Sequence, residues 1–150
     1  MNWKNFALEA TELASFGERR LATGVAYLAT IRKDGSPRVH PVSPFVGDGR
    51  LFIFMEPTSP KRFDLRGDGR YALHCAVEDI EGGNGEFCIT GRATFIDDPL
   101  LRSVAFEAAT ARGFSPKERY ILFELGIDTA MASTYEENQV VRKKWSAEEK

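Results

Sequence analysis

The segment from Thr58 to Arg62 carries the residues best suited to binding an anion. Thr58-Ser59-Pro60-Lys61-Arg62 has the order of a helix start, with Ser59 as N-cap and Pro60 in the first helical position. Lys61 and Arg62 would then face the positive end of the helix dipole, which disfavours each cation by about 0.3–1 kcal/mol at exposed positions. A phosphate would reverse this penalty, because it accepts hydrogen bonds from backbone N–H groups, hydroxyls and cations. Residues 58–62 are therefore a candidate phosphate site.

Two other segments that could begin a helix carry their own negative charge. Ser115-Pro116-Lys117-Glu118 has the same Ser-Pro-Lys order, but Glu118 is placed to complete a capping box with Ser115. Asp97-Asp98-Pro99 brings acidic side chains to a third predicted helix start. Of the three segments, only residues 58–62 leave the positive end of the helix without an internal anion.

Lys61 and Arg62 also have a simpler interpretation, in which they pair with nearby acids or stay solvated. Surface pairs of this kind are common and contribute little to stability. The acids closest in the sequence are Glu56, Asp64 and Asp68.

The chain has neither a GxxxxGK loop nor a GxGxxG fingerprint, so a nucleoside triphosphate or Rossmann site is not supported. It also lacks Ser-His-Asp order, HExxH and a nucleophile elbow, so hydrolysis is not expected.

The histidines and cysteines are few. His40 and His74 could each serve as a proton donor or a haem ligand, because imidazole titrates near neutral pH. Two histidines are too few for a convincing metal site, and a hydrogen-bonded barrel histidine is the simpler interpretation of His74. Cys75 and Cys88 lie in apolar, strand-like runs without CxxC spacing, which predicts buried thiols.

Size and composition are those of one globular domain. The chain has 150 residues, 43% apolar and 28% charged, and we expect a single domain over residues 1–150. A net charge of -2 argues against non-specific nucleic-acid binding, which draws on an excess of Lys and Arg. There is no signal-peptide pattern and no run approaching the ~18 apolar residues of a membrane span. We therefore expect a soluble, cytoplasmic protein with no nucleic-acid or membrane partner.

Hydrophobic periodicity predicts a mainly β fold with a few helices. An amphipathic helix is expected over residues 3–20, ending at Gly17, followed by a barrel over about residues 21–136 and a solvated tail over 137–150. The expected strands are 25–31, 38–46, 51–55, 71–77, 87–96, 120–126 and 130–135, the first three as a meander, with helices at 60–66 and 98–112. Consecutive antiparallel strands with so few helices favour a barrel or sandwich over a βαβ sheet.

Three segments in this order resemble the pyridoxamine 5'-phosphate oxidase-like superfamily, including its flavin and deazaflavin oxidoreductase branches. They are residues 29–42 (ATIRKDGSPRVHPV), 58–66 (TSPKRFDLR) and 70–73 (RYAL), within a likeness that spans about residues 20–135. The resemblance implies a six-stranded antiparallel split β-barrel that forms a homodimer. It also implies two cofactors in clefts between the subunits.

The resemblance further implies which residues meet the cofactor. The strand with His40, Pro41, Val42 and Ser43 would lie along the flavin ring and present backbone groups to its polar edge. Phe54 and Met55 would flank the ring or the ribityl chain. Ser59 and Lys61 would hold the phosphate, and the dipole argument adds Thr58 and Arg62. No catalytic side chain is expected, because the ring itself carries hydride-transfer chemistry.

Two functions follow from this resemblance. The first is an oxidoreductase that binds FMN, or alternatively the deazaflavin F420, and passes a hydride to or from a small, flat, conjugated substrate. The second is a non-enzymatic carrier or sensor of flavin or haem, because relatives on this barrel include haem binders. Trp145 has two interpretations as well: it could fold over a cofactor, or it could be a simple hydrophobic anchor.

Overall fold

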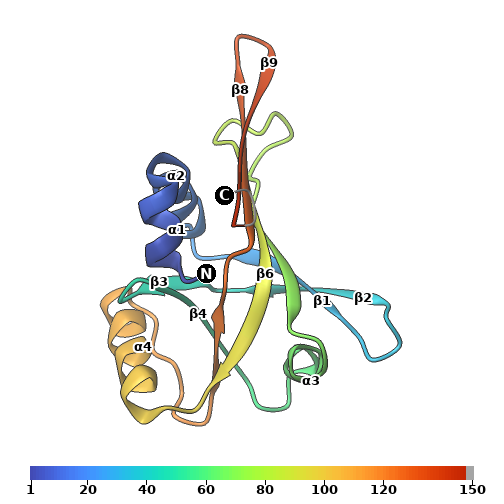
Figure 1. Ribbon diagram of the computed structural model, residues 1–150. Helices are drawn as coiled ribbons and strands as arrows, with labels where there is room; N and C mark the ends of the chain where they lie inside the picture. The colour runs from blue at the N-terminus through green and yellow to red at the C-terminus, as the bar shows by residue number, and fades with distance from the viewer. Residues whose placement is uncertain (148–150) are drawn as a thin grey trace.

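The computed structural model describes residues 1–147, and in that part of the chain nine antiparallel strands form one connected sheet that curls into a half-open barrel (Figure 1). The strands are β1 (Ala26–Ile31), β2 (Pro37–Val42), β3 (Phe45–Gly47), β4 (Arg50–Met55), β5 (Arg70–Cys75), β6 (Glu86–Ile96), β7 (Ile121–Leu125), β8 (Thr129–Glu136) and β9 (Gln139–Ser146). The helices are α1 (Trp3–Glu9), α2 (Thr11–Leu21), α3 (Pro60–Gly67) and α4 (Pro99–Ala111). The mainly β class is confirmed, but the expected count of six strands is wrong.

The strand order is β2-β1-β5-β6-β7-β4-β3, with β8 on β6 and β9 on β8. The expected strand over residues 38–46 is broken at Ser43-Pro44, where the chain leaves β2 and enters β3. The hairpins β1–β2 and β3–β4 therefore lie at opposite ends of the strand order, and β4 pairs with β7. Both neighbouring pairs of the predicted meander are found, but its middle strand is split between the two hairpins.

Strand β6 belongs to both parts of the barrel, and it changes partner at Gly91. Its residues 86–90 pair with β8, whereas residues 93–96 pair with β7. A Cβ atom at Gly91 would lie 1.8 Å from the carbonyl oxygen of Gly126. That oxygen accepts a hydrogen bond from the Tyr71 hydroxyl at 2.7 Å, and the Gly126 N–H donates to Arg92 O at 2.8 Å. Only glycine allows the backbones to approach this closely.

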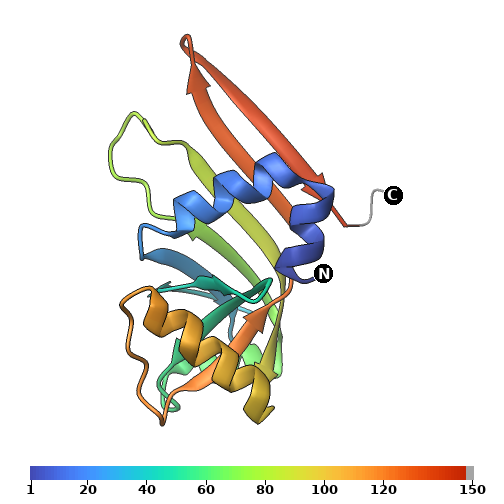
Figure 2. The ribbon, with the colours of Figure 1, turned by 90° about the vertical axis from the view of Figure 1, so that its left-hand side faces the viewer.

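Helices α1 and α2 lie across one face of the sheet (Figure 2). The single helix expected over residues 3–20 is two helices, which meet at Ala10 with φ -137° and ψ 63°. Gly17 does not end the helix, because it lies inside α2, where a Cβ atom would be 2.2 Å from the buried ring of Phe87.

Cys75 is buried as predicted, whereas Cys88 is only half-buried. Across residues 1–147, the helices all fall short of the length and apolarity needed to cross a membrane.

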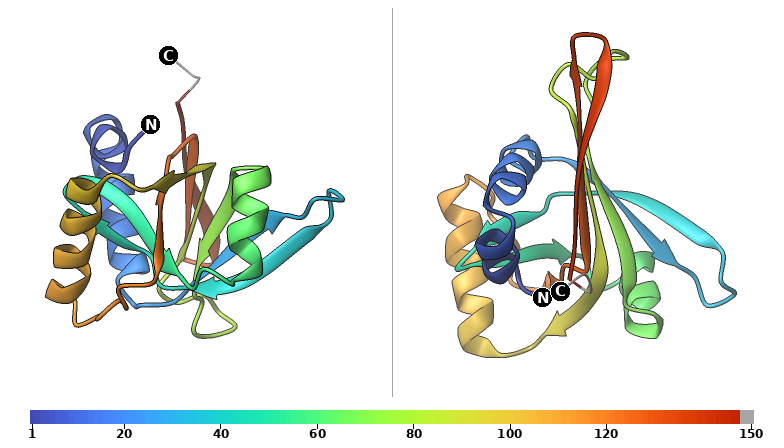
Figure 3. Two further views of the ribbon diagram at one scale, coloured as in Figure 1. Left: turned by 90° about the horizontal axis from the view of Figure 1, so that it is seen from below. Right: turned by 45° about the horizontal axis from the view of Figure 1, so that its top comes forward.

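The C-terminal residues form a strand where a solvated tail was expected. β9 pairs with β8 along its whole length, and the hairpin extends beyond the rest of the sheet (Figure 3). Trp145 Nε1 donates to Glu9 Oε2 at 3.1 Å, and the Trp145 ring lies 4.8 Å from that of Phe6. These contacts favour the anchor interpretation of Trp145, because they fasten the hairpin to α1.

Replacing Trp145 with alanine should lower the free energy of unfolding by about 1–3 kcal/mol, because it removes a half-buried ring and its hydrogen bond. Urea unfolding measures the change. Val140→Ala is the matched control, because Val140 is 45% exposed in the same hairpin; its effect should stay within about 0.5 kcal/mol. A Trp145→Ala protein of unchanged stability would contradict the anchor role.

The two other predicted helix starts, at residues 97–99 and 115–118, have different outcomes. Asp98 caps α4, since its Oδ1 accepts from Leu100 N at 3.0 Å, as its position in the sequence predicts. Residues 115–118 form no helix, and the chain passes through a turn at Glu118 before β7 begins. The predicted capping box is therefore wrong. The Glu118 carbonyl instead accepts from Arg102 Nη2 at 2.6 Å.

Candidate functional site

Helix α3 begins as the sequence predicts, with Ser59 as N-cap residue and Pro60 in the first helical position. Ser59 is extended, with φ -63° and ψ 131°, but its side chain does not cap the helix. Its Oγ accepts a hydrogen bond from Lys61 Nζ at 2.8 Å instead. The hydroxyl and the ammonium group therefore lie together at the positive end of α3.

The three acids that could have neutralised Lys61 and Arg62 are paired with other arginines. These pairs are Arg119 Nε to Glu56 Oε2 at 2.9 Å, Arg38 Nε to Asp64 Oδ2 at 2.7 Å, and Arg70 Nη2 to Asp68 Oδ2 at 2.7 Å. Hydrogen bonding from Arg70 lowers the pKa of Asp68 to about 2. Within residues 60–67 the first helical turn contains no acid. The interpretation that these acids neutralise the helix start is therefore not supported.

Asp64 fixes α3 on the barrel. It is buried, and its Oδ2 accepts from Thr30 Oγ1 of β1 at 2.7 Å as well as from Arg38 Nε of β2. Charge-assisted hydrogen bonds such as these are the stronger kind. The Asp64 carboxylate thus holds α3 against two strands, and α3 lies beside β1 (Figure 3).

Substituting Asp64 with asparagine should lower the free energy of unfolding by about 1–3 kcal/mol, because the Arg38 guanidinium loses its counter-charge in a partly buried position. Thermal or urea unfolding measures this loss. Asp68→Asn is the control, since it removes the carboxylate of the C-cap residue of α3 from an exposed pair, and its effect should be much smaller. Equal losses in both variants would contradict the role given to Asp64.

His40 lies beside this helix start. Burial alternates along β2, so the side chains of Arg38 and His40 share its inner face. His40 Nε2 is a buried atom with no hydrogen-bond partner among residues 1–147. Burial lowers the pKa of His40, and the charges of Lys61 and Arg38 lower it further. Burial also lowers the pKa of Lys61. Two basic groups at this helix start are therefore in surroundings that disfavour their positive charge, which is the chemistry that fits a phosphate.

The other two residues of the predicted phosphate site are at the edge of this group. Thr58 is exposed in the turn before α3. Arg62 Nη1 donates to the Pro57 carbonyl at 2.7 Å, and its guanidinium lies 5.1 Å from the Phe63 ring centroid. Arg62 thus braces the turn with one of its donors.

The predicted ring-contacting residues do not form a single group. Pro41 is exposed on the outer face of β2, whereas Val42 and Met55 are buried in the main core. Phe54 packs under α4, where its ring stacks on Phe45 at 5.8 Å. Of these side chains, only that of Pro41 is open to a ring lying along the strand.

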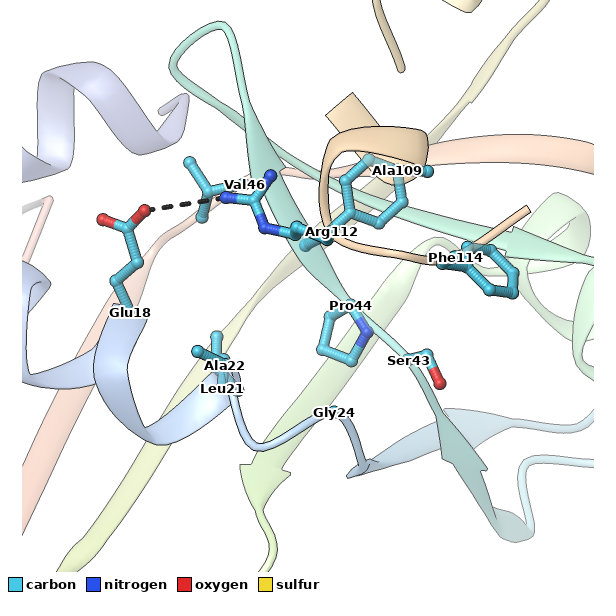
Figure 4. A pocket seen from close by; sticks show the side chains of 11 residues that line it. Glu18, Leu21, Ala22, Gly24, Ser43, Pro44, Val46, Ala109, Arg112 and Phe114 are labelled. Carbon is cyan, nitrogen blue, oxygen red and sulfur yellow. Dashed lines mark ion pairs between the residues drawn. The ribbon is translucent and has the colours of Figure 1, made fainter. Parts of the chain in front are cut away.

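Ser43 faces a separate cavity of about 380 Å³ between the end of α2, the β2–β3 connection and the end of α4 (Figure 4). Arg112 Nη2 and Glu18 Oε1 are 3.9 Å apart at its edge. The lining side chains are mainly apolar and include neither Ser59 nor Lys61. The cavity and the start of α3 are therefore two different places on the protein.

Comparison with known proteins relates most of the chain to one family. A family model for pyridoxamine 5'-phosphate oxidase matches residues 17–124, which contain β1 to β6 and α3. No curated protein matches the chain.

Solved structures share the fold at low sequence identity. A NimC/NimA family protein from Clostridium acetobutylicum is 18% identical, with a TM-score of 0.61 over 91% of this chain and 99% of that one. The haem storage protein HutZ from Vibrio cholerae is 16% identical, with a TM-score of 0.59 over 85% and 92%. A haem-binding protein from Mycobacterium smegmatis is 15% identical, with a TM-score of 0.66 over 88% of this chain and 57% of that one. These likenesses concern the fold alone.

Proposed function

Because the chain belongs to the pyridoxamine 5'-phosphate oxidase family, we propose that it is an oxidoreductase that binds FMN, with F420 as the alternative cofactor. The observation that carries this proposal is the start of α3. There Lys61 is half-buried and lacks an acidic partner in the helix's first turn. Its charge acts on His40, whose buried Nε2 atom has no hydrogen-bond partner among residues 1–147. A phosphate would satisfy both groups.

Each part of the site has a role in this proposal. Ser59 and Lys61 hold the phosphate together with backbone N–H groups of the first turn of α3, and Thr58 and Arg62 border it. The backbone of β2 from His40 to Ser43 lies along the ring and fixes its orientation. When bound, the cofactor supplies hydride transfer to or from a small, flat, conjugated substrate. The protein contributes position, exclusion of water and local charge.

The proposed active form is a homodimer with cofactors between the subunits. Its support is an apolar surface on the outer face of β1 and β2. Tyr27 is 47% exposed and Val39 is 63% exposed, and the exposed Pro41 lies opposite Tyr27. Apolar patches of this kind commonly mark interfaces. A second copy of the chain on this surface would cover it.

Titration of the purified protein with FMN and with F420, followed by fluorescence, tests this proposal. We expect one of the two to bind, and the bound cofactor to be reduced or reoxidised by a conjugated partner under anaerobic conditions. Native mass measurement should give two chains and two cofactors. A protein that binds neither cofactor would contradict the proposal.

A haem or flavin carrier is the second candidate, supported by the shared fold with the haem proteins above. His74 is poorly placed as an axial ligand, because its Nδ1 lies 2.6 Å from Cys75 O and its Nε2 lies 3.3 Å from Glu86 Oε1. His40 Nε2 has no such partner within residues 1–147. A Soret band that His40→Gln abolishes, or a bound flavin that never turns over, would favour the carrier.

A further inference from the structure

One hydrogen bond joins β2 to α3, from Arg38 Nε to Asp64 Oδ2 at 2.7 Å. Residues two apart on a strand share a face, and so do residues three apart on a helix. Two residues along β2 from Arg38 is His40, and three residues back along α3 from Asp64 is Lys61. This register directs both side chains toward the start of α3, where the Lys61 charge acts on His40.

The surroundings of His40 are unusually positive for a basic group. Besides Lys61 of α3, the charges that act on it are Arg38 of β2, Arg32 in the β1–β2 turn and Asp64 of α3. Asp64 is the one anion, and its Oδ2 already accepts from Arg38. Burial and the three cations lower the pKa of His40 below its ordinary value of 6.5, so the free imidazole is neutral at pH 7. Its Nε2 atom is left without a partner in the described chain.

We propose that His40 is a direct ligand of the cofactor phosphate and gains a proton from solvent when the phosphate binds. This inference rests on the proposed function. The protonated imidazole donates from Nε2 to a phosphate oxygen that Lys61 Nζ also contacts. Two cations and the Ser59 hydroxyl then enclose one anion, and the buried nitrogen acquires its missing partner. Binding of FMN becomes coupled to the protonation of one histidine.

The coupling has a definite sign. A phosphate beside His40 stabilises the imidazolium ion, so the pKa of His40 is higher in the complex than in the free protein. At pH values between these two pKa values, binding takes up a proton. The affinity is therefore greatest at low pH and falls as the pH rises through this interval, by up to about tenfold per pH unit. The phosphate's own second ionisation, with a pKa of about 6 for phosphomonoesters, acts in the opposite direction.

The chain offers a direct readout, because His40 and His74 are its only histidines. Their two imidazole signals can be followed by NMR as a function of pH, with the His40→Gln variant identifying each. In the presence of FMN the His40 signal should titrate at a higher pH than in its absence. The His74 signal is the internal control and should respond equally in both cases. Riboflavin, which lacks the phosphate, should leave both signals unchanged.

Calorimetric titration with FMN at one pH, in buffers of different ionisation enthalpy, measures proton uptake directly. Wild type should take up more protons per FMN than His40→Gln, and the difference isolates His40 from Lys61 and from the phosphate. If FMN binds and the His40 signal and the proton uptake do not change, this inference is wrong while the proposed function stands. If only F420 binds, F420 replaces FMN in both experiments. If neither binds at any pH, both proposals are wrong.

Discussion

Lys61→Ala should weaken FMN binding by about 10- to 100-fold. A hydrogen bond to a charged group contributes about 1.5–3 kcal/mol, and about 1.4 kcal/mol corresponds to a factor of ten in affinity. Lys61 is half-buried, touches Ser59 Oγ and has no acid in the first turn of α3 to compete with a ligand. The loss should concern the phosphate alone, so riboflavin should bind both proteins equally. Fluorescence titration at fixed pH and salt measures these affinities.

Lys117→Ala is the matched control for this experiment. Lys117 follows the same Ser-Pro dipeptide as Lys61, but it is exposed in an irregular segment and does not begin a helix. Its replacement should leave FMN affinity unchanged within about twofold. Lys61→Ala should also keep its unfolding temperature, because a half-buried charge is removed rather than introduced. Equal effects of the two substitutions on FMN binding would show that Lys61 has no special role.

Gly91→Ala should lower the free energy of unfolding by about 1–3 kcal/mol or more, up to a failure to fold. Added atoms in a well-packed site force shifts that cost this much. The new Cβ atom would lie 1.8 Å from Gly126 O, a backbone atom that also accepts from the Tyr71 hydroxyl. No rotation of a flexible side chain can relieve that overlap. The strand pairing on both sides of Gly91 has to shift instead.

Gly67→Ala is the control, because a Cβ atom there meets nothing within 4 Å and Gly67 ends α3. This change should leave the protein as stable as before or more stable by about 0.5–1 kcal/mol, as expected where alanine replaces a helical glycine. Urea unfolding compares the two variants. If Gly91→Ala does not fold, Tyr71→Phe tests the same junction more gently, with an expected loss of about 1 kcal/mol. Wild-type stability in both Gly91→Ala and Tyr71→Phe would contradict the described junction.

The strands that could be predicted are those in which the pattern of apolar residues follows the burial of each residue. β4 is almost continuously buried and was recognised as an apolar run. β9 has exposed residues at most positions, because it is an edge strand that pairs with β8 and is anchored through its own Trp145. Its sequence therefore shows no alternation. The break between α1 and α2 at Ala10 has no glycine or proline beside it to signal it. Gly17 does not mark a helix end, because it allows α2 to pack closely against the Phe87 ring of β6.

The candidate site likewise has parts that depend on neighbouring residues and parts that depend on contacts between residues far apart in the sequence. The helix start at Ser59 and Pro60 depends on neighbouring residues, so it can be predicted from the sequence. The position of His40 next to Lys61 depends on how β2 crosses α3, and the pairing of Asp64 with Arg38 joins residues 26 positions apart. Neither residue type nor spacing encodes such a pairing. Phe54 illustrates the converse, because its place on β4 directs the ring under α4 instead of toward Lys61.

The shared strand β6 also sets the order in which the chain can fold as it is synthesised. One edge of β6 can pair with β5 as soon as residue 96 has been made, but the partners of its other edge, β7 and β8, end only at Glu136. At a translation rate of about 5–20 residues per second, these 40 residues take about 2–8 s. During that time the edge of β6 is an unpaired template for other chains. Nascent chains of this protein are thus most exposed to aggregation through this edge between the synthesis of residue 96 and that of Glu136.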